Sequence, residues 1–122
     1  MIALDEEAQH EVTRLCIQAA LLLLQYGAES KVVVDVSTRL GYALGATRVE
    51  CTLTANSIVL TTVFDRYCIT TARRNVDRGV NMTVVSSVQR IMLAAEEGRL
   101  DRVGVHEALE AVQQRTQVYS CL

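Results

Sequence analysis

Several residue types that commonly build ligand sites are scarce in this chain of 122 residues. It has no tryptophan or proline, one phenylalanine and four tyrosines, so an aromatic cage around a ligand is not expected. Its two histidines, His10 and His106, and its four cysteines show no C-x-x-C or other metal-ligand spacing. The sequence therefore predicts neither a metal centre nor a cofactor.

The chain also lacks an excess of positive charge and a long apolar run. Twelve basic and 14 acidic side chains give a formal charge of −2, which disfavours nucleic-acid binding because phosphates require a basic face. The longest aliphatic run, residues 19–24, is far shorter than the ~20 residues that cross a bilayer as a helix. The acidic N-terminus is unlike a signal peptide. We expect residues 1–122 to form one soluble domain in a reducing compartment.

The first 45 residues are predicted to form two helices. Apolar residues recur at three- and four-residue spacing over 6–26, with Asp5 as a cap and Gly27 as a left-handed stop. Both faces of this helix carry leucines, so we expect it to be buried on more than one side; the alternative is a contact with another subunit. The valines of residues 28–44 favour a strand when taken alone, but the longer apolar register favours a helix that ends at Gly45.

Alternation of apolar and polar residues begins at Thr47. It predicts three strands over residues 47–54, 58–64 and 67–73. The connections between them are only a few residues long, so consecutive strands should pair as an antiparallel meander.

Helical spacing returns over residues 84–95 and again over 105–112, and Asp101 is the predicted cap of the second of these helices. The tail from residue 113 has only a weak pattern. The expected fold class is thus α+β, with two N-terminal helices, a three-stranded antiparallel meander and two C-terminal helices.

The sequence offers little for nucleophilic catalysis. A Ser or Cys nucleophile requires a histidine within hydrogen-bonding distance, and both histidines fall on the polar sides of predicted helices. We therefore expect no enzymatic activity. The alternative is a small hydrolase-like enzyme with Ser57 or Cys68 as its nucleophile.

An arginine cluster follows the predicted meander. Arg73, Arg74 and Arg78 lie within six residues, and Asn81 directly precedes a predicted helix. Guanidinium groups match carboxylate geometry, and helix N-terminal amides add positive potential. These four residues are the predicted binding site for a small carboxylate. The alternative is a structural cluster in which Arg73 and Arg74 end a strand and Arg78 pairs with Asp77 or with a helix C-terminus.

Five short motifs carry a resemblance to a known family. They are LQYGAES at residues 24–30, TRLG at 38–41, SIVLTT at 57–62, RGVN at 78–81 and EGRL at 97–100. Their identity and order resemble the threonine/serine exporter family of membrane transporters, over essentially the whole chain.

This resemblance implies a cytoplasmic domain at the bacterial inner membrane, with transmembrane helices expected after residue 122. It implies export of threonine, serine or succinate together with a second small membrane subunit. A homo-oligomer is also expected, and a pure oligomerisation module without a ligand is a further alternative.

Overall fold

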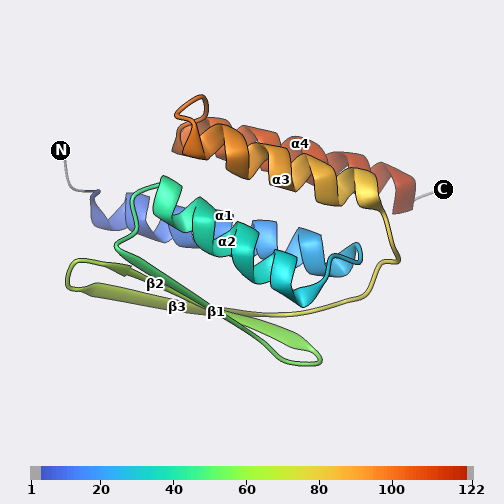
Figure 1. Ribbon diagram of the computed structural model, residues 1–122, viewed down its shortest axis with the longest axis horizontal. Helices are drawn as coiled ribbons and strands as arrows, with labels where there is room; N and C mark the ends of the chain where they lie inside the picture. Colours follow the sequence, from blue (N-terminus) through green and yellow to red (C-terminus); the bar gives the residue numbers. More distant parts are fainter. Residues whose placement is uncertain (1–3, 121–122) are drawn as a thin grey trace.

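The computed structural model describes residues 4–120, and the side chains of residues 4–116. The elements form three layers, with the sheet on one side, α1 and α2 in the middle, and α3 and α4 on the other side (Figure 1). They are α1 (Glu6–Gln25), α2 (Ser30–Ala43), β1 (Arg48–Leu53), β2 (Ser57–Phe64), β3 (Tyr67–Arg74), α3 (Met82–Glu96) and α4 (Arg102–Ser120). This order confirms the predicted α+β fold.

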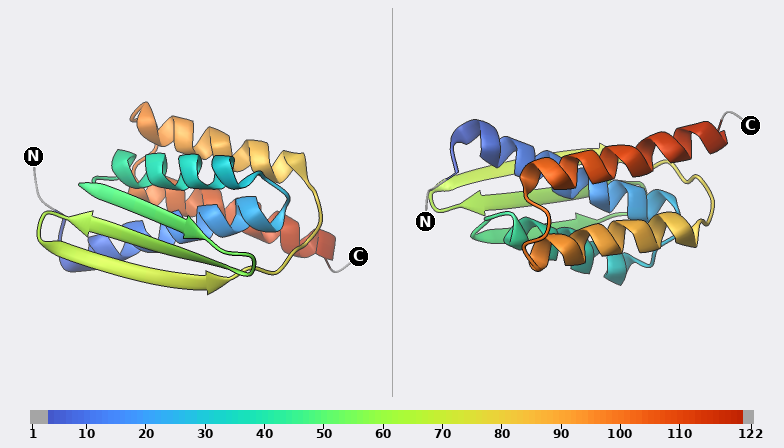
Figure 2. Two further views of the ribbon diagram at one scale, coloured as in Figure 1. Left: turned by 60° about the horizontal axis from the view of Figure 1, so that its bottom comes forward. Right: turned by 90° about the horizontal axis from the view of Figure 1, so that it is seen from above.

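The sheet is an antiparallel meander with strand order β1-β2-β3. Ser57 at the start of β2 lies opposite Arg74 at the end of β3. Every second residue of β2 is buried beneath the helices, because successive side chains of a strand point to opposite faces. These residues are Ile58, Leu60, Thr62 and Phe64. The other face of the sheet is not covered by any helix of the described chain (Figure 2).

α1 lies at the centre of the molecule, between the sheet and the outer helix pair (Figure 2). It contacts β2 and β3 on one side and α3 and α4 on the other. Leu15 and Leu23, and also Ile17, are therefore all buried. The prediction that the first helix is buried on more than one side is confirmed.

Local sequence signals set the ends of the two N-terminal helices. The Oδ1 atom of Asp5 accepts a hydrogen bond of 2.8 Å from the amide of Ala8 and caps α1. Gly27 and Gly45 follow the two helices with φ angles of +92° and +108°. Other residues rarely adopt this left-handed conformation, so these glycines end the helices as predicted.

The valine-rich segment is helical because one face of α2, including Val33 and Val36, is fully buried. Gly41 lies on the same helix against β1 and α1. A Cβ atom there would lie 2.5 Å from Cγ2 of Val49 and 3.2 Å from Sγ of Cys16. Only glycine fits this close contact without displacing its neighbours.

The last helix is longer than the sequence pattern indicated. Asp101 caps it as predicted, accepting a hydrogen bond of 2.9 Å from the amide of Gly104. The helix then continues through the weakly patterned tail to Ser120. Glutamine and arginine are good helix formers, and Val112 and Thr116 are buried, so the helix needs no strong apolar stripe to continue.

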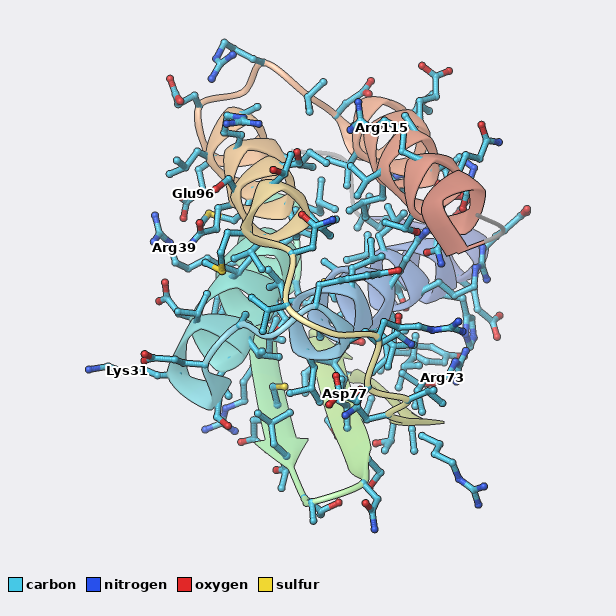
Figure 3. The ribbon with its side chains drawn as sticks, turned by 90° about the vertical axis from the view of Figure 1, so that its right-hand side faces the viewer. Lys31, Arg39, Arg73, Asp77, Glu96 and Arg115 are labelled. Carbon is cyan, nitrogen blue, oxygen red and sulfur yellow. The ribbon has the colours of Figure 1, made fainter. Side chains whose placement is uncertain are left out.

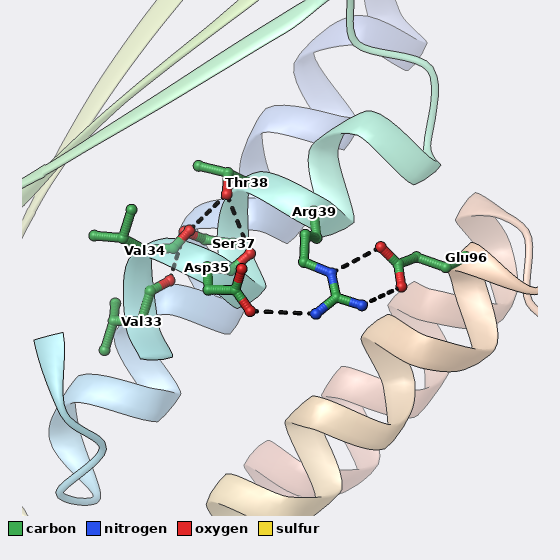
Figure 4. Close-up of polar contacts among 7 residues, drawn as sticks. All are labelled: Val33, Val34, Asp35, Ser37, Thr38, Arg39 and Glu96. Atoms are coloured by element: carbon green, nitrogen blue, oxygen red, sulfur yellow. Dashed lines mark hydrogen bonds and ion pairs between the residues drawn. The ribbon is translucent and has the colours of Figure 1, made fainter. Parts of the chain in front are cut away.

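An ion-pair network joins the middle layer to the outer one (Figure 4). Arg39 of α2 forms a fork with Glu96 of α3, with Nε–Oε2 and Nη2–Oε1 distances of 2.9 and 2.6 Å. Its third nitrogen, Nη1, donates to Asp35 at 3.2 Å. The hydrogen bonds from Arg39 lower the pKa of Glu96 below its ordinary value, and those to Glu96 and Asp35 raise the pKa of Arg39.

The layered arrangement gives the molecule two distinct ends. Residues 73–82, the start of α3 and the C-terminal end of α4 lie at one end, on the right of Figure 1, which we call the loop end. The connections 44–47 and 97–101 lie at the other, on the left, which we call the far end.

Candidate functional site

The four residues of the predicted carboxylate site all lie at the loop end, but in different settings. Arg73 and Arg74 are the last two residues of β3, and Arg78 lies in the segment that follows; all three are exposed. The Nη1 atom of Arg73 donates to Thr71 Oγ1 at 2.8 Å and to the carbonyl of Ala72 at 2.9 Å. One nitrogen of its guanidinium group is thus already hydrogen-bonded within β3.

The segment 75–81 is held firmly against the end of α1. The amide of Arg78 donates to the carbonyl of Gln25 at 2.9 Å, and the amide of Asn81 donates to the carbonyl of Tyr26 at 3.0 Å. The last carbonyls of a helix have no partner within it, so the segment satisfies them. Gly27 lies against Val80, where an added Cβ atom would be 3.0 Å from Cγ2 of Val80. The motifs at residues 24–30 and 78–81, which are about 50 residues apart in the sequence, therefore meet in the fold.

Asn81 caps a helix and also lines a cavity. Its Oδ1 atom accepts hydrogen bonds from the amides of Thr83 at 3.1 Å and Val84 at 3.4 Å, which makes it the N-cap of α3. The rest of the side chain borders a cavity between α3 and α4. Of the four predicted residues, Asn81 is the one that lines this cavity.

The cavity between α3 and α4 has a volume of about 330 Å³. Its polar lining comes from the N-cap and the first three turns of α3 and from the last described side chains of α4. Those residues are Asn81, Thr83, Ser87, Arg90, Arg115 and Thr116, and the apolar side chains of Val84 and Val112 complete the lining. In Figure 3, Arg115 lies on the side of α4 that faces α3, well away from Arg73 beside the sheet.

Positive potential dominates this cavity. Within residues 4–116, no carboxylate forms an ion pair with Arg90 or Arg115, and Arg90 makes only a long hydrogen bond of 3.4 Å to Ser87. The N-terminus of α3 adds its dipole. Two guanidinium groups, hydroxyl donors and a helix N-terminus together form a setting suited to one or two carboxylate groups.

Sequence reasoning did not find Arg90 and Arg115. The signal for Arg90 is its spacing after Thr83 and Ser87, which places three polar side chains on one face of α3. Arg115 had no such signal, because it lies in the tail whose helical continuation the pattern did not predict.

A larger cavity, of about 530 Å³, lies at the far end. Its charged lining residues are Asp65, Asp101 and Arg102, so carboxylates predominate there. Asp101 is already engaged as the cap of α4, and Arg102 is 3.9 Å from Glu11. This cavity is less suited to an anion than the one between α3 and α4.

The geometry gives no support to the two nucleophiles considered from the sequence. Ser57 hydrogen-bonds Thr54 in a turn, with an Oγ–Oγ1 distance of 2.7 Å, and Cys68 is exposed at the start of β3. Neither is hydrogen-bonded to a histidine within the described side chains. Burial also raises the pKa of the Cys16 thiol to about 12, so it stays protonated and unreactive at neutral pH.

Comparison with known proteins places the chain in a family. The family model described as "Putative threonine/serine exporter" matches residues 14–122, which is most of the chain. The chain belongs to this family. The resemblance carried by its five short motifs is therefore confirmed.

Three curated bacterial proteins are similar to this chain. A protein of Escherichia coli named "Probable succinate transporter subunit YjjP" is 50% identical over 110 residues, covering 90% of this chain and 43% of that protein. A protein of the same name from Klebsiella aerogenes is 50% identical over 109 residues, covering 89% of this chain and 42% of that protein. An uncharacterized protein of Haemophilus influenzae is 60% identical over 93 residues, covering 76% of this chain and 31% of that protein.

The chain thus spans less than half the length of the curated relatives that it matches. Within the part that the structure describes, no helix has both the length and the apolar character needed to cross a membrane. No solved structure is significantly similar to this chain.

Proposed function

We propose that this chain is the cytoplasmic domain of an exporter subunit in the bacterial inner membrane, and that it binds the carboxylates of the exported molecule between α3 and α4. Succinate or a hydroxy amino acid is the proposed cargo. Membership of the exporter family and the names of the E. coli and K. aerogenes relatives support the transport role. The observation that carries the binding role is the cavity with Arg90 and Arg115 free of carboxylate partners among the described residues.

The partners proposed with this role are the chain's own transmembrane region, a second small membrane protein and further copies of the same chain. The word "subunit" in the names of two relatives supports an assembly of several chains. A hydrolase is disfavoured because the described part of the chain brings no histidine to Ser57 or Cys68. Hydrolysis of simple ester substrates by the purified protein would support the hydrolase and contradict this proposal.

Succinate titration by calorimetry tests the binding role. Succinate should bind more tightly than butyrate, which has nearly the same length but only one carboxylate. Arg115→Gln and Arg90→Gln should each weaken succinate binding about tenfold, because each removes a charged hydrogen-bond donor from the cavity.

Two further variants serve as controls. Arg99→Gln removes an exposed arginine that pairs with Glu97 at the far end, and it should leave binding unchanged. Arg78→Gln tests the original prediction that Arg73, Arg74, Arg78 and Asn81 form the site. A loss of binding in Arg78→Gln, with none in Arg115→Gln, would move the site to the exposed segment. Equal responses to succinate and butyrate in all variants would refute carboxylate binding altogether.

Export itself is tested in cells. A bacterial strain that lacks the gene should release less succinate into the medium than its parent. The complete gene should restore release, and the Arg115→Gln allele should restore it only partly. Unchanged succinate release in the deletion strain would contradict the transport role for this substrate.

A further inference from the structure

Three apolar side chains at the loop end are largely exposed, although one of them, Val80, also lies against Gly27. Val76, Val80 and Met82 have exposed fractions of 50%, 77% and 56%. They lie within seven residues of each other, on the segment that joins β3 to α3. Single exposed apolar residues are common on protein surfaces, whereas several of them on one short segment favour an interaction surface.

These side chains are exposed although the backbone of their segment is held in place by hydrogen bonds. Backbone hydrogen bonds hold the segment at three points along its length: Asn75 to Asn56 at 2.7 Å, Arg78 to Gln25 at 2.9 Å and Asn81 to Tyr26 at 3.0 Å. The backbone is therefore fixed to the end of α1 and to the turn between β1 and β2, while the apolar side chains face outward.

Positive charge surrounds the exposed apolar side chains. Residues 73–82 contain Arg73, Arg74 and Arg78 against a single acid, Asp77, which gives a formal charge of +2. Within residues 4–116, none of the three arginines forms an ion pair with a carboxylate. Asp77 instead accepts a hydrogen bond of 2.9 Å from the amide of Gly79. Residues 96–102 at the far end carry three acids and two arginines.

We propose that the loop end rests on an anionic phospholipid surface. Val76, Val80 and Met82 enter the boundary between headgroups and acyl chains, and the arginines bind the lipid phosphates. Apolar tips flanked by guanidinium groups are the chemistry that such a surface recognises. The end of α4 also lies at this end of the molecule (Figure 1), so the contact would orient the whole helix pair towards the membrane.

A second copy of the chain is a poorer occupant of this surface. In a symmetric dimer the same patch meets itself, so the arginines of both copies would face each other. The charge of the patch is instead complementary to phosphate. The surface is separate from the cavity residues Arg90 and Arg115, so lipid binding and succinate binding can fail independently.

Vesicle sedimentation tests this proposal with the chain as it stands. The protein should sediment with vesicles of phosphatidylcholine containing about 30 mol% phosphatidylglycerol, and much less with phosphatidylcholine alone. The double variant Arg73→Gln/Arg78→Gln should bind the anionic vesicles about 25-fold more weakly, since each basic residue near the surface contributes about fivefold. Met82→Asp and Val80→Asp should each bind the anionic vesicles more weakly than the parent protein, because each places a carboxylate against the lipid.

A matched control lies at the far end. Val103, at the start of α4, is 56% exposed, so Val103→Asp makes the same chemical change on a comparable side chain and should leave sedimentation unchanged. Thermal melting of each variant separates loss of binding from loss of folding. Equal sedimentation with neutral and anionic vesicles overturns the proposal. The proposal is also overturned if the parent protein forms an oligomer, does not bind vesicles, and loses the oligomer in Val80→Asp. The patch would then be a contact between proteins.

Discussion

The two ends of the molecule use the same kinds of residue for different purposes. Near the far end, three arginines are paired with acids: Arg39 with Glu96, Arg99 with Glu97, and Arg102 with Glu11. At the loop end, the arginines lack carboxylate partners within the described side chains, and apolar residues are exposed. Charges that satisfy one another contribute to the fold, whereas unpaired charges beside a cavity or an apolar surface remain available to an external ligand.

If this contrast is correct, the far end should be sensitive to changes in packing and the loop end to changes in binding. The following three variants therefore address the packed region near the far end, in order of decreasing effect on stability. The succinate and vesicle experiments address the loop end.

Gly41→Ala should have the largest effect. Alanine favours a helix over glycine by about 1 kcal/mol, so the propensity alone predicts stabilisation. The close approach of Val49 and Cys16 reverses the sign, and we expect a loss of about 2 kcal/mol in the free energy of unfolding. Urea unfolding measures it.

Gly104→Ala is the matched control for this variant. Gly104 lies in the first turns of α4, and its added Cβ atom would meet mainly the flexible end of Leu100. We expect this variant to be neutral or slightly stabilising. Stability of Gly41→Ala equal to or above that of the parent would show that α2 and β1 are less closely packed than described.

Thr62→Val should have an intermediate effect. The Oγ1 atoms of Thr62 and Thr13 are 2.6 Å apart in the buried contact between β2 and α1. Thr13 donates its own hydroxyl proton to the carbonyl of Gln9, so Thr62 must be the donor within the pair. Valine keeps the shape but removes the donor, and we expect a loss of about 1 kcal/mol by urea unfolding.

Thr62→Ser provides the control for the hydroxyl group. It keeps the donor and loses a buried methyl group, so its cost arises from packing. A double-mutant cycle with Thr13→Val isolates the hydrogen bond. Additive effects in that cycle would contradict a coupled pair.

Glu96→Gln should have the smallest effect, and one that depends on pH. Arg39 holds the pKa of Glu96 below its ordinary value of 4.5, so the folded state binds this proton less readily than the unfolded state. The stabilisation is therefore complete above pH 4.5 and is lost as the pH falls through the lowered folded-state pKa. Thermal melting should show a difference between variant and parent near neutral pH that vanishes in acid.

Glu97→Gln is the neighbouring control for the ion-pair network. Glu97 pairs with Arg99 two residues away and joins no separate elements, so its replacement should alter stability less. Because the Arg39–Glu96 pair is exposed, 1 M salt should weaken its effect. A pH-independent difference between parent and Glu96→Gln would contradict the assigned role of the ion pair.

The sequence predicted those parts of the fold whose signals are local. Asp5 as a cap, Gly27 and Gly45 as helix ends, and the alternation that begins at Thr47 each act within a few residues, so their outcome follows from the chain itself. The valine-rich part of α2 required a longer window, because strand propensity there is opposed by burial along one helical face.

The candidate site was only partly predictable, because it depends on contacts between distant residues. Asn81 was found from its position before a helix. Arg115 reaches the same cavity only because α4 continues beyond residue 113 and packs beside α3, and the packing against α3 depends on residues far from Arg115 in the sequence. The exposed arginines of the cluster were visible in the sequence, but their separation from this cavity was not.

The hydrogen bonds from residues 78 and 81 to the end of α1 also bear on how the protein is made. A nascent chain that stops before residue 78 leaves the carbonyls of Gln25 and Tyr26 without these partners, even when both N-terminal helices and the whole meander have been synthesised. The last turn of α1 closes through local bonds, such as the one from the amide of Tyr26 to the carbonyl of Leu22. Capping of the carbonyls that follow this turn has to wait until the ribosome has passed the arginine cluster.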